Sequence, residues 1–394
     1  MLDEKILATR TSRMAASAIR EILKVLGQPG MISLAGGIPS PDSYPIDLIR
    51  QLADQVLTKY GHKALQYDLT EGFLPLREEI VKFVNKKGFN ADVPNVLITS
   101  GSQGALDAIG KVFVSRGDKI GMEAPTYLGA IQAFNPYGPE YVSMETDEDG
   151  LIPEAFEKTI QQHGIKLAYL IPTFQNPSGR TITLARRKKI AAIAQKYNTL
   201  IIEDDPYSML RFKGEEVPAL RTLAPDHVAY MGTFSKILAP GLRLGYTIAP
   251  PIVTKWMTLS KQGVDLHSGT FGQAIAAEYL AGGYLEPHVE KIIRLYAPKL
   301  QAMLDALEKY FPKNWNYSKP EGGMFVWAEG PKGIDTEKLY PKCVERKAAF
   351  VPGKFFYTNM ADGLATMRLN FTMATEQQIH TAIEIIADVL KQAS

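Results

Sequence analysis

The 394-residue sequence contains one cysteine, Cys343, and this scarcity excludes several kinds of site. A single thiol cannot form an intramolecular disulfide, and it cannot supply a thiolate-rich zinc or iron–sulfur centre. The six histidines show neither the HExxH spacing nor a pairing with nearby carboxylates, so we do not expect a metal enzyme. Cys343 itself is predicted to be a buried structural residue.

Long apolar runs and a strong excess of either charge are also missing. No segment approaches the ~18 uninterrupted apolar residues of a membrane span, and the mixed-charge N-terminus is not typical of a secretory or transit signal. The 44 Lys and Arg residues nearly balance the 42 Asp and Glu residues, and the basic run ARRKK at 185–189 is typical of one solvated helix face. We therefore expect a cytoplasmic protein that binds neither nucleic acid nor membrane.

The order of the apolar segments indicates the α/β class. From about residue 96, short β-rich runs alternate with longer segments of helical periodicity, which is typical of parallel strands joined by crossover helices. We predict a mostly parallel sheet with helices on both faces. The predicted strands are VLIT at 96–99, KIGMEA, KLAYLIP, TLIIEDD, VAYMGTFS and RLGYTIAP.

The chain length and a change of pattern near residue 285 indicate a second domain, because 394 residues are too many for one hydrophobic core. A long helix, further strands and a final helix follow that point, which predicts a smaller α+β domain. The predicted organisation is an N-terminal arm and helix at 1–45 that packs with the small domain, a large domain at 46–285, and the small domain at 286–394.

Polar residues at the predicted strand ends are the first candidates for a site, because ligands bind at the carboxyl ends of strands in an open parallel sheet. Ser102, Gln103 and Gly104 begin a predicted helix, where free N–H groups and the helix dipole attract an anion such as phosphate. Ser102 could equally be an ordinary helix cap. Asn176 and Gly179 follow another strand, and both also belong to common turn sequences.

Three consecutive carboxylates, Glu203, Asp204 and Asp205, follow the apolar run Leu-Ile-Ile, and Tyr207 comes shortly after. Carboxylates that directly follow a buried apolar run are not expected to lie in a fully solvated loop. We expect one of them to face a positive partner in a largely buried place.

Lys236 lies in TFSKILAPGLR, among Phe234, Ile237 and Leu238. Most lysines are exposed, so a surface loop is its ordinary interpretation. Apolar surroundings, however, lower the pKa of a lysine and make its neutral amine available as a nucleophile. Arg243 is a second cation nearby that suits a phosphate and would lower this pKa further.

The strand ends together offer an amine nucleophile, an anion pocket, a buried carboxylate, a phenol and an amide. The sequence has no GxGxxG or GxxxxGK[ST] stretch, and its pattern supplies no histidine for a Ser–His–Asp or Cys–His hydrolase. The combination suits pyridoxal 5'-phosphate, whose aldehyde requires a lysine, whose phosphate requires an anion cradle and whose ring nitrogen requires an acid partner.

With these residues in view, the chain resembles the fold-type I, class I/II pyridoxal-phosphate aminotransferases over nearly its whole length, and most of all the 2-aminoadipate, kynurenine and broad-specificity aromatic or branched-chain branch. The resemblance implies a seven-stranded, mostly parallel sheet, transfer of an amino group to 2-oxoglutarate by a ping-pong mechanism, and a homodimer with shared active sites. It is carried by ISLAGGIPSPDSYP, LQYDLTEGFLPLRE, ITSGSQGALD, EAPTYLGA, PTFQNPSGRT, EDDPYSML, GTFSKILAPGLRLGY, KQGVDLHSG, PEGGMFVW and MRLNFT.

The resemblance implies a role for each matching residue. Lys236 would bind the cofactor aldehyde covalently and later move a proton, Asp204 would pair with the ring nitrogen, and Arg368 would clamp the substrate α-carboxylate. The other implied cofactor contacts are Asn176 and Tyr207 at the phenolic oxygen, Tyr127 on the ring face, Ser102, Gln103, Gly104, Ser235 and Arg243 at the phosphate, and Tyr67 at the phosphate of the neighbouring subunit. The implied substrate contacts are Arg368, Asn176, Gly37, Arg20 and Tyr67.

Two positions bear on how closely the family pattern applies. Many relatives read GSQQAL where this chain reads GSQGAL, so Gly104 replaces a side chain, and we expect this to alter packing more than cofactor binding. Arg20 aligns with an arginine on a mobile N-terminal helix that accepts a distal carboxylate in the 2-aminoadipate enzymes. It could equally be an exposed helix arginine. Tyr44 and the apolar face of Ile19, Ile22 and Leu23 could line the same pocket for aromatic or branched side chains.

Other functions on the same scaffold stay open at this point. A β-lyase or decarboxylase would use the same cofactor and break a different bond at Cα. A ligand-sensing domain of a transcription regulator is disfavoured, because such regulators carry a winged-helix DNA-binding domain before the aminotransferase-like part, whereas here the resemblance begins within the first 35 residues. A catalytically silent relative is disfavoured because Lys236, Asp204, Arg243 and Arg368 are all present.

Overall fold

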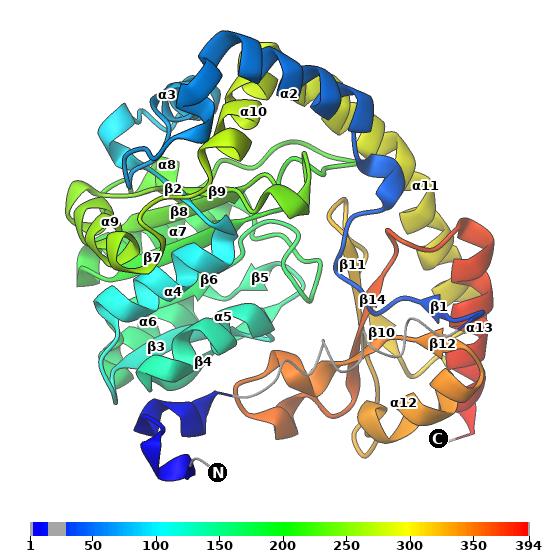
Figure 1. Cartoon of the computed structure of the whole chain (residues 1–394). Helices are drawn as coiled ribbons and strands as arrows, with labels where there is room; N and C mark the ends of the chain where they lie inside the picture. The colour runs from blue at the N-terminus through cyan, green and yellow to red at the C-terminus, as the bar shows by residue number, and fades with distance from the viewer. Residues whose placement is uncertain (1–2, 15–28, 393–394) are drawn as a thin grey trace.

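The structure is a computed structural model that describes residues 3–14 and 29–392. Its largest sheet has eight strands (Figure 1). In spatial order these strands are β2 (Val96–Thr99), β9 (Gly245–Ile248), β8 (Val228–Thr233), β7 (Leu200–Asp205), β6 (Leu167–Leu170), β3 (Lys119–Ala124), β4 (Glu140–Asp147) and β5 (Gly150–Leu151).

The prediction of a mostly parallel sheet is confirmed, with two antiparallel additions. Strands β4, β3, β6, β7 and β8 pair in parallel. Strand β9 is antiparallel to both β2 and β8, because the connection from β8 holds only the short 3-10 turn η8 (Pro240–Leu242) and no crossover helix. The eighth strand, β5, is a two-residue antiparallel return beside β4, so the predicted count of seven omits this hairpin.

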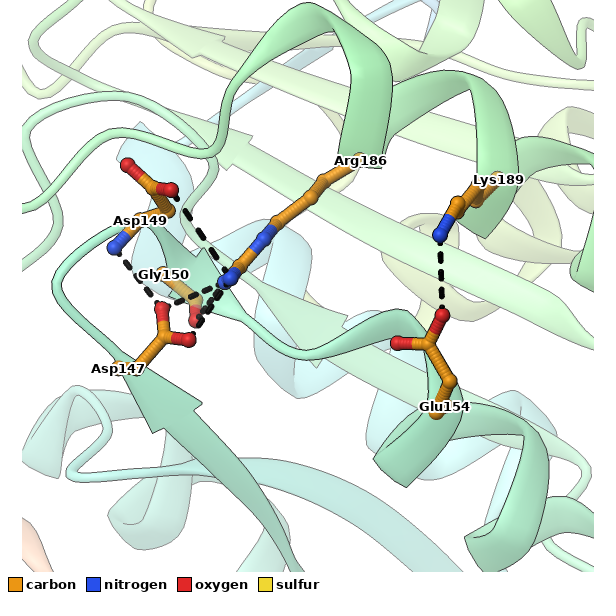
Figure 2. Close-up of polar contacts among 6 residues, drawn as sticks. All are labelled: Asp147, Asp149, Gly150, Glu154, Arg186 and Lys189. Carbon is orange, nitrogen blue, oxygen red and sulfur yellow. Dashed lines mark hydrogen bonds and ion pairs between the residues drawn. The ribbon is translucent and has the colours of Figure 1, made fainter.

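Arg186, from helix α7 (Leu184–Tyr197), holds the β4–β5 hairpin in place (Figure 2). Its Nη1 and Nη2 atoms donate to the two carboxylate oxygens of Asp147 at 2.6 and 2.7 Å, and Nη1 also donates to the Gly150 carbonyl at 3.1 Å. Lys189, one helical turn further, pairs with Glu154 at 3.0 Å. A bidentate arginine fork of this kind fixes geometry as well as charge.

The prediction that ARRKK forms one solvated helix face is wrong at Arg187. This side chain is 1% exposed. Its guanidinium donates to the carbonyls of Ile182, Pro172 and Pro218, so it is a buried cation whose donors are used by loop carbonyls. Lys188 and Lys189 are exposed as predicted.

Helices cover both faces of the large sheet, as predicted. Apolar side chains of α4, α5 and α9 share one buried cluster with the sheet residues Met122, Tyr169 and Ile202, whereas those of α6, α7 and α8 pack on the opposite face. Helices α2, α3 and α10 pack over the β2–β9 end. The bounds are α2 (Ile46–Tyr60), α3 (Leu74–Asn85), α4 (Gly101–Phe113), α5 (Leu128–Phe134), α6 (Pro153–His163), α8 (Leu220–Leu223), α9 (Pro251–Asp265) and α10 (Thr270–Ala281).

The C-terminal part forms a smaller antiparallel sheet with three helices, and Figure 1 shows the long α11 running from the large sheet toward it. Strand β1 (Ile32–Ser33) pairs with β12, which joins this part of the N-terminal arm to the C-terminal part. The elements are α11 (Leu285–Tyr310), β10 (Asn316–Tyr317), β11 (Phe325–Glu329), α12 (Thr336–Glu345), β12 (Ala348–Ala349), β13 (Val351–Pro352), β14 (Thr366–Asn370) and α13 (Glu376–Lys391).

The predicted domain limits at residues 45 and 285 lie at the starts of α2 and α11, and the division into domains stays a prediction. The predicted helix around SAIREILKVLG lies outside the described residues, and so does Arg20. Cys343 is buried and free, as expected. In residues 3–14 and 29–392, no helix combines the length and the apolar character that a membrane crossing needs.

Candidate active site

The carboxyl ends of the parallel strands bring together residues that are far apart in sequence. Lys236 follows β8, Asp204 lies in β7, Asn176 follows β6 and Tyr127 follows β3. Arg368 reaches the same place from β14 of the small sheet, and its Nη1 donates to Asn176 Oδ1 at 2.9 Å. The strand-end cluster therefore lies where the large and small sheets meet.

The amine of Lys236 lies in surroundings that disfavour its charge. Burial, and after it the positive charges of Arg368 and Arg243, lower its pKa from 10.5 to about 8. Its Nζ atom donates a hydrogen bond of 2.9 Å to the Gly37 carbonyl. A lysine held this way has a large neutral fraction near physiological pH, which is the form that acts as a nucleophile or base.

The three carboxylates after Leu-Ile-Ile have three different surroundings. Glu203 is buried, and its two oxygens accept from the backbone N–H groups of Leu220 and Arg221 at 2.8 Å each. Asp205 is half-buried and accepts from the Ser208 N–H. Asp204 is 3% exposed and accepts one bond, at Oδ2 from the Tyr169 hydroxyl.

Asp204 differs from its neighbours in having an oxygen to spare. Its Oδ1 atom is buried and has no hydrogen-bond partner among the described residues. Burial raises the pKa of this carboxyl and the bond from Tyr169 opposes the rise, so that its pKa is about 7 instead of 3.8. The positive charge expected near one of the three carboxylates is that of buried Arg187, which lowers the pKa of Glu203. Asp204 has no such partner among the described residues and is a buried acid with one acceptor uncommitted.

Arg368 is 2% exposed and is fixed from several sides. Its Nη2 donates to the Ala35 carbonyl at 2.8 Å, and its guanidinium carbon lies 4.3 Å from the ring centre of Phe325 and 4.9 Å from that of Phe356. Burial lowers its pKa to about 10. An arginine has five N–H donors, so the bonds to Asn176 and Ala35 leave three uncommitted. One of the three is on Nε, which is buried without a partner among the described residues.

The start of α4 and the loop that carries Arg243 form a small anion-binding arrangement. The Ser102 hydroxyl is buried without a hydrogen-bond partner in the described chain, and Arg243 Nη2 lies 3.5 Å from the Ser100 carbonyl. Gly101 has a φ of +71°, and a Cβ at this position would lie 2.6 Å from Arg243 Nη2. Free N–H groups of a helix start, a hydroxyl and a guanidinium are the groups that bind phosphate.

The other predicted phosphate contacts are Ser235, Gln103 and Gly104. The Ser235 hydroxyl accepts a bond of 3.0 Å from Thr233 Oγ1, and the Ser235 N–H donates to the same oxygen at 3.1 Å. Gln103 lies in the first turn of α4 and uses its side-chain amide to donate to the Gly129 carbonyl at 2.9 Å. At Gly104, an added Cβ would meet only Ser100 Cβ, at 3.5 Å.

Tyr127 and Tyr207 contribute two phenols to the cluster. Burial raises the pKa of each above the ordinary value, and each phenol is electrostatically coupled to Asp204 and Arg368. The Tyr207 hydroxyl accepts a bond of 3.4 Å from Asn176 Nδ2. Both phenols therefore stay neutral and can donate hydrogen bonds to an acceptor in the cluster.

Tyr67 lies apart from the cluster on the surface. Its side chain is 77% exposed, with its ring edge-on to His267 at 5.7 Å between ring centres. The neighbouring Leu65 and Leu69 are 70% and 61% exposed. This is an unusually apolar stretch for a free surface.

A cleft of about 900 Å³ opens elsewhere, between the β4–β5 turn and the small sheet, and it shares no lining residue with the strand-end cluster. Acidic and basic side chains line it together, among them Asp149, Arg180, Arg211 and Glu321. The residues predicted to contact the cofactor and the substrate therefore do not line this cleft.

Three residues of the cluster were not predicted. Phe325 and Phe356 hold the Arg368 guanidinium between their rings, and Phe325 lies in the motif PEGGMFVW without any feature that marks it. Tyr169 carried a usable signal, because it is the one polar side chain inside the apolar strand LAYL.

Comparisons with known proteins show what the whole chain is similar to. The sequence matches the family model for aminotransferase class I and II over residues 29–386. It is 43% identical to aromatic-amino-acid aminotransferase 1 of Thermococcus litoralis, over 99% of this chain and 95% of that protein.

Two solved structures are similar over nearly their whole length. One is a kynurenine aminotransferase of Pyrococcus horikoshii in complex with PMP, with 42% identity, a TM-score of 0.95, and coverage of 99% of this chain and 98% of that one. The other is an alpha-aminoadipate aminotransferase of Thermus thermophilus complexed with N-(5'-phosphopyridoxyl)-L-leucine, with 37% identity, a TM-score of 0.91 and the same coverage.

Proposed function

Since the chain belongs to the class I and II aminotransferases and is a pyridoxal-phosphate-dependent enzyme of amino acid transamination, we propose that its strand-end cluster is the active site. We further propose that 2-oxoglutarate is the amino acceptor and that the donors are 2-aminoadipate, aromatic, branched-chain or kynurenine-like amino acids. The observation that carries the assignment of the site is the buried, unpartnered Oδ1 of Asp204.

The residues present fit the cofactor. A buried acceptor such as Asp204 Oδ1 is costly unless a donor occupies it, and a protonated ring nitrogen is such a donor. The unpartnered Ser102 hydroxyl and Arg243 suit the phosphate, with Gly101 leaving room for Arg243. Ser235 would complete the phosphate site.

The other predicted contacts follow from the same assignment. Tyr207 and Asn176 would bond the phenolic oxygen, Tyr127 would lie on the ring face, and Gln103 and Gly104 would border the phosphate. When bound, pyridoxal 5'-phosphate supplies an aldehyde that carries the amino group and a ring that takes up the electrons released at the substrate Cα.

Lys236 is the base of the reaction in this proposal. Its lowered pKa leaves much of the amine neutral near pH 8, so in the first half-reaction it would take a proton from the substrate Cα and pass it to the carbon that carried the cofactor's aldehyde. In the second half-reaction it would move a proton in the reverse direction. The Nζ atom donates to the Gly37 carbonyl at 2.9 Å here. With the cofactor bound, Nζ would instead be joined to its aldehyde, and the amine would be freed when an amino acid takes its place.

Arg368 orients the substrate. Its three uncommitted N–H donors can bind the α-carboxylate as a bidentate pair. The rings of Phe325 and Phe356 fix the guanidinium plane, which sets the direction in which the Cα–H bond points. Gly37 borders the same space, since an added Cβ there would lie 3.2 Å from Phe325 Cζ.

The dimer with shared sites is part of the proposal. Tyr67 would reach the phosphate and substrate of the partner subunit, and its 77% exposed side chain between exposed Leu65 and Leu69 is consistent with a surface that a second copy covers. Two measurements on the parent protein and on Tyr67→Ser test this point. The size in solution should be that of a dimer for both proteins, while the affinity for the cofactor should fall in the variant.

A screen of amino donors with 2-oxoglutarate tests the reaction. Formation of glutamate and the matching 2-oxo acid is the expected result, with parallel double-reciprocal lines for ping-pong kinetics. Release of ammonia in the absence of any oxo acid would contradict transamination. Failure of Asp204→Ala to weaken cofactor binding would contradict the site.

Arg20 is proposed to bind the distal carboxylate of glutamate and 2-oxoglutarate. Arg20→Ala should raise KM for these substrates far more than for leucine or phenylalanine. Arg294→Ala is a matched control, because Arg294 is an exposed helix arginine. Equal effects of Arg20→Ala on all substrates would remove Arg20 from the site.

A further inference from the structure

Tyr169 lies beneath the strand-end cluster on the same face of the sheet as Asp204. It pairs in register with Ile202 of the neighbouring strand, and Asp204 follows two residues later, so the two side chains project from the same face. The Tyr169 hydroxyl donates to Asp204 Oδ2 at 2.7 Å, and the two residues are 0% and 3% exposed.

Because of this bond, the two carboxylate oxygens of Asp204 differ in their hydrogen bonding. Oδ2 is committed to Tyr169, whereas Oδ1 has no partner among the described residues. The ring of Phe134 meets that of Tyr169 edge-on at 6.4 Å between ring centres, so the phenol is itself fixed by packing. The carboxylate consequently has one oxygen that anchors its rotation and one that is available.

We propose that Tyr169 is a positioning residue for the cofactor: it orients the Asp204 carboxylate and keeps it ionised, so that Oδ1 is presented as an anion to the ring nitrogen. The inference rests on the proposed role of Asp204. In this role Tyr169 affects the affinity for the cofactor without contacting the substrate.

Several charged or titratable groups act on this pair. Asp205 raises the pKa of Asp204, and the phenols of Tyr127 and Tyr207 are coupled to it. Glu123 and Tyr127 act on Tyr169. Burial and the charge of Asp204 raise the pKa of Tyr169 well above its ordinary value. Tyr169 therefore stays protonated, and its hydrogen bond favours the ionised form of Asp204.

The same strand supplies a matched control. Asp205 Oδ2 accepts a hydrogen bond of 2.9 Å from the hydroxyl of Tyr230, which is 6% exposed. Because alternate residues of a strand face opposite ways, this tyrosine–aspartate pair lies on the other face. Tyr230→Phe deletes the same kind of bond one residue away.

The experiment measures the affinity of the cofactor-free protein for pyridoxal 5'-phosphate and for its carbocyclic analogue, which has CH in place of the ring nitrogen. Tyr169→Phe should weaken binding of pyridoxal 5'-phosphate by about tenfold near neutral pH, the lower end for a hydrogen bond to a charged group. Binding of the analogue should be unchanged. The deficit should shrink as the pH rises above the Asp204 pKa, and Tyr230→Phe should bind both ligands as the parent protein does.

A second substitution at Tyr169 should raise the affinity for the cofactor, a result that a folding defect could not produce. Replacing Tyr169 with 3-fluorotyrosine keeps the shape and makes the phenol a stronger donor, so affinity for pyridoxal 5'-phosphate should rise and its pH dependence should move to lower pH. Equal losses for both ligands in Tyr169→Phe, or no loss for either, would overturn the inference. Asp204→Asn separates the two proposals: if it leaves affinity intact, the assigned role of Asp204 itself is wrong.

Discussion

The lowered pKa of Lys236 leads to a quantitative prediction for the cofactor-free protein. With a pKa of about 8 instead of 10.5, about half of the Lys236 amines are neutral at pH 8, against roughly 0.3% for an ordinary lysine. At pH 8 the neutral fraction of Lys236 available to a small acylating reagent is therefore about 150 times that of a lysine with the ordinary pKa.

The assay is pulse labelling with acetic anhydride from about pH 6 to about pH 11, with each lysine quantified by mass spectrometry of its peptide. Acylation of Lys236 should rise to a plateau with a midpoint near pH 8. Lys82 is the internal control, because its bond to Glu79 raises its pKa above 10.5 and its labelling should still be rising at the highest pH.

A variant tests the cause of the shift. The positive charge of Arg368 contributes to the low pKa of Lys236, so Arg368→Gln should move the labelling midpoint upward while that of Lys82 stays fixed. A Lys236 midpoint near that of Lys82 in the parent protein would refute the reasoning, because it would show that burial does not disfavour the charged amine.

Two further predictions concern the clamp and the phosphate site. Arg368→Lys keeps the charge but loses the planar fork. The activation free energy for kcat/KM with amino acids should therefore rise by roughly 1.5–3 kcal/mol, which is a 10- to 150-fold loss of kcat/KM. Turnover of a primary amine without a carboxylate should fall much less, and equal losses would contradict the clamp. Gly101→Ala should weaken phosphate binding and lower the melting temperature, because its φ is +71° and the new Cβ would lie 2.6 Å from Arg243. Gly104→Ala, where the new Cβ would make one ordinary contact with Ser100 Cβ at 3.5 Å, should leave cofactor affinity intact and raise stability by about 0.5–1 kcal/mol; a loss of affinity there would show that the helix start tolerates no side chain.

The strands that build the site were predictable from sequence because they are buried on both faces. VLIT, KIGMEA and TLIIEDD lie in the structure as β2, β3 and β7, because a short apolar core is the signal of a strand buried in a sheet. The same signal did not show that β2 pairs antiparallel with β9. Strand β4 (Glu140–Asp147) was not predicted, because only one of its eight residues is fully buried. Its neighbour β5 is two residues long and depends on Arg186, a contact that no local pattern carries.

The candidate site was predictable wherever a residue type conflicts with its surroundings. Lys236 among apolar residues and Asp204 after Leu-Ile-Ile are conflicts of this kind, and in the structure Lys236 is half-buried and Asp204 is buried. Which of the three carboxylates is uncommitted depends on cross-strand partners such as Tyr169 and on the N–H groups of Leu220. Those partners lie 17 or more residues away in sequence, beyond the reach of a local pattern.

The bonds of Arg368 also constrain when the site can form during folding. Its partners Asn176 and Ala35 lie 192 and 333 residues earlier in the chain. Contacts of such separation form late, since the intervening chain must be ordered first. A chain emerging from the ribosome therefore lacks the proposed carboxylate clamp until β14 has joined the small sheet. If Arg368 has this role, substrate binding requires the C-terminal strand, the large sheet and the N-terminal arm to have docked together.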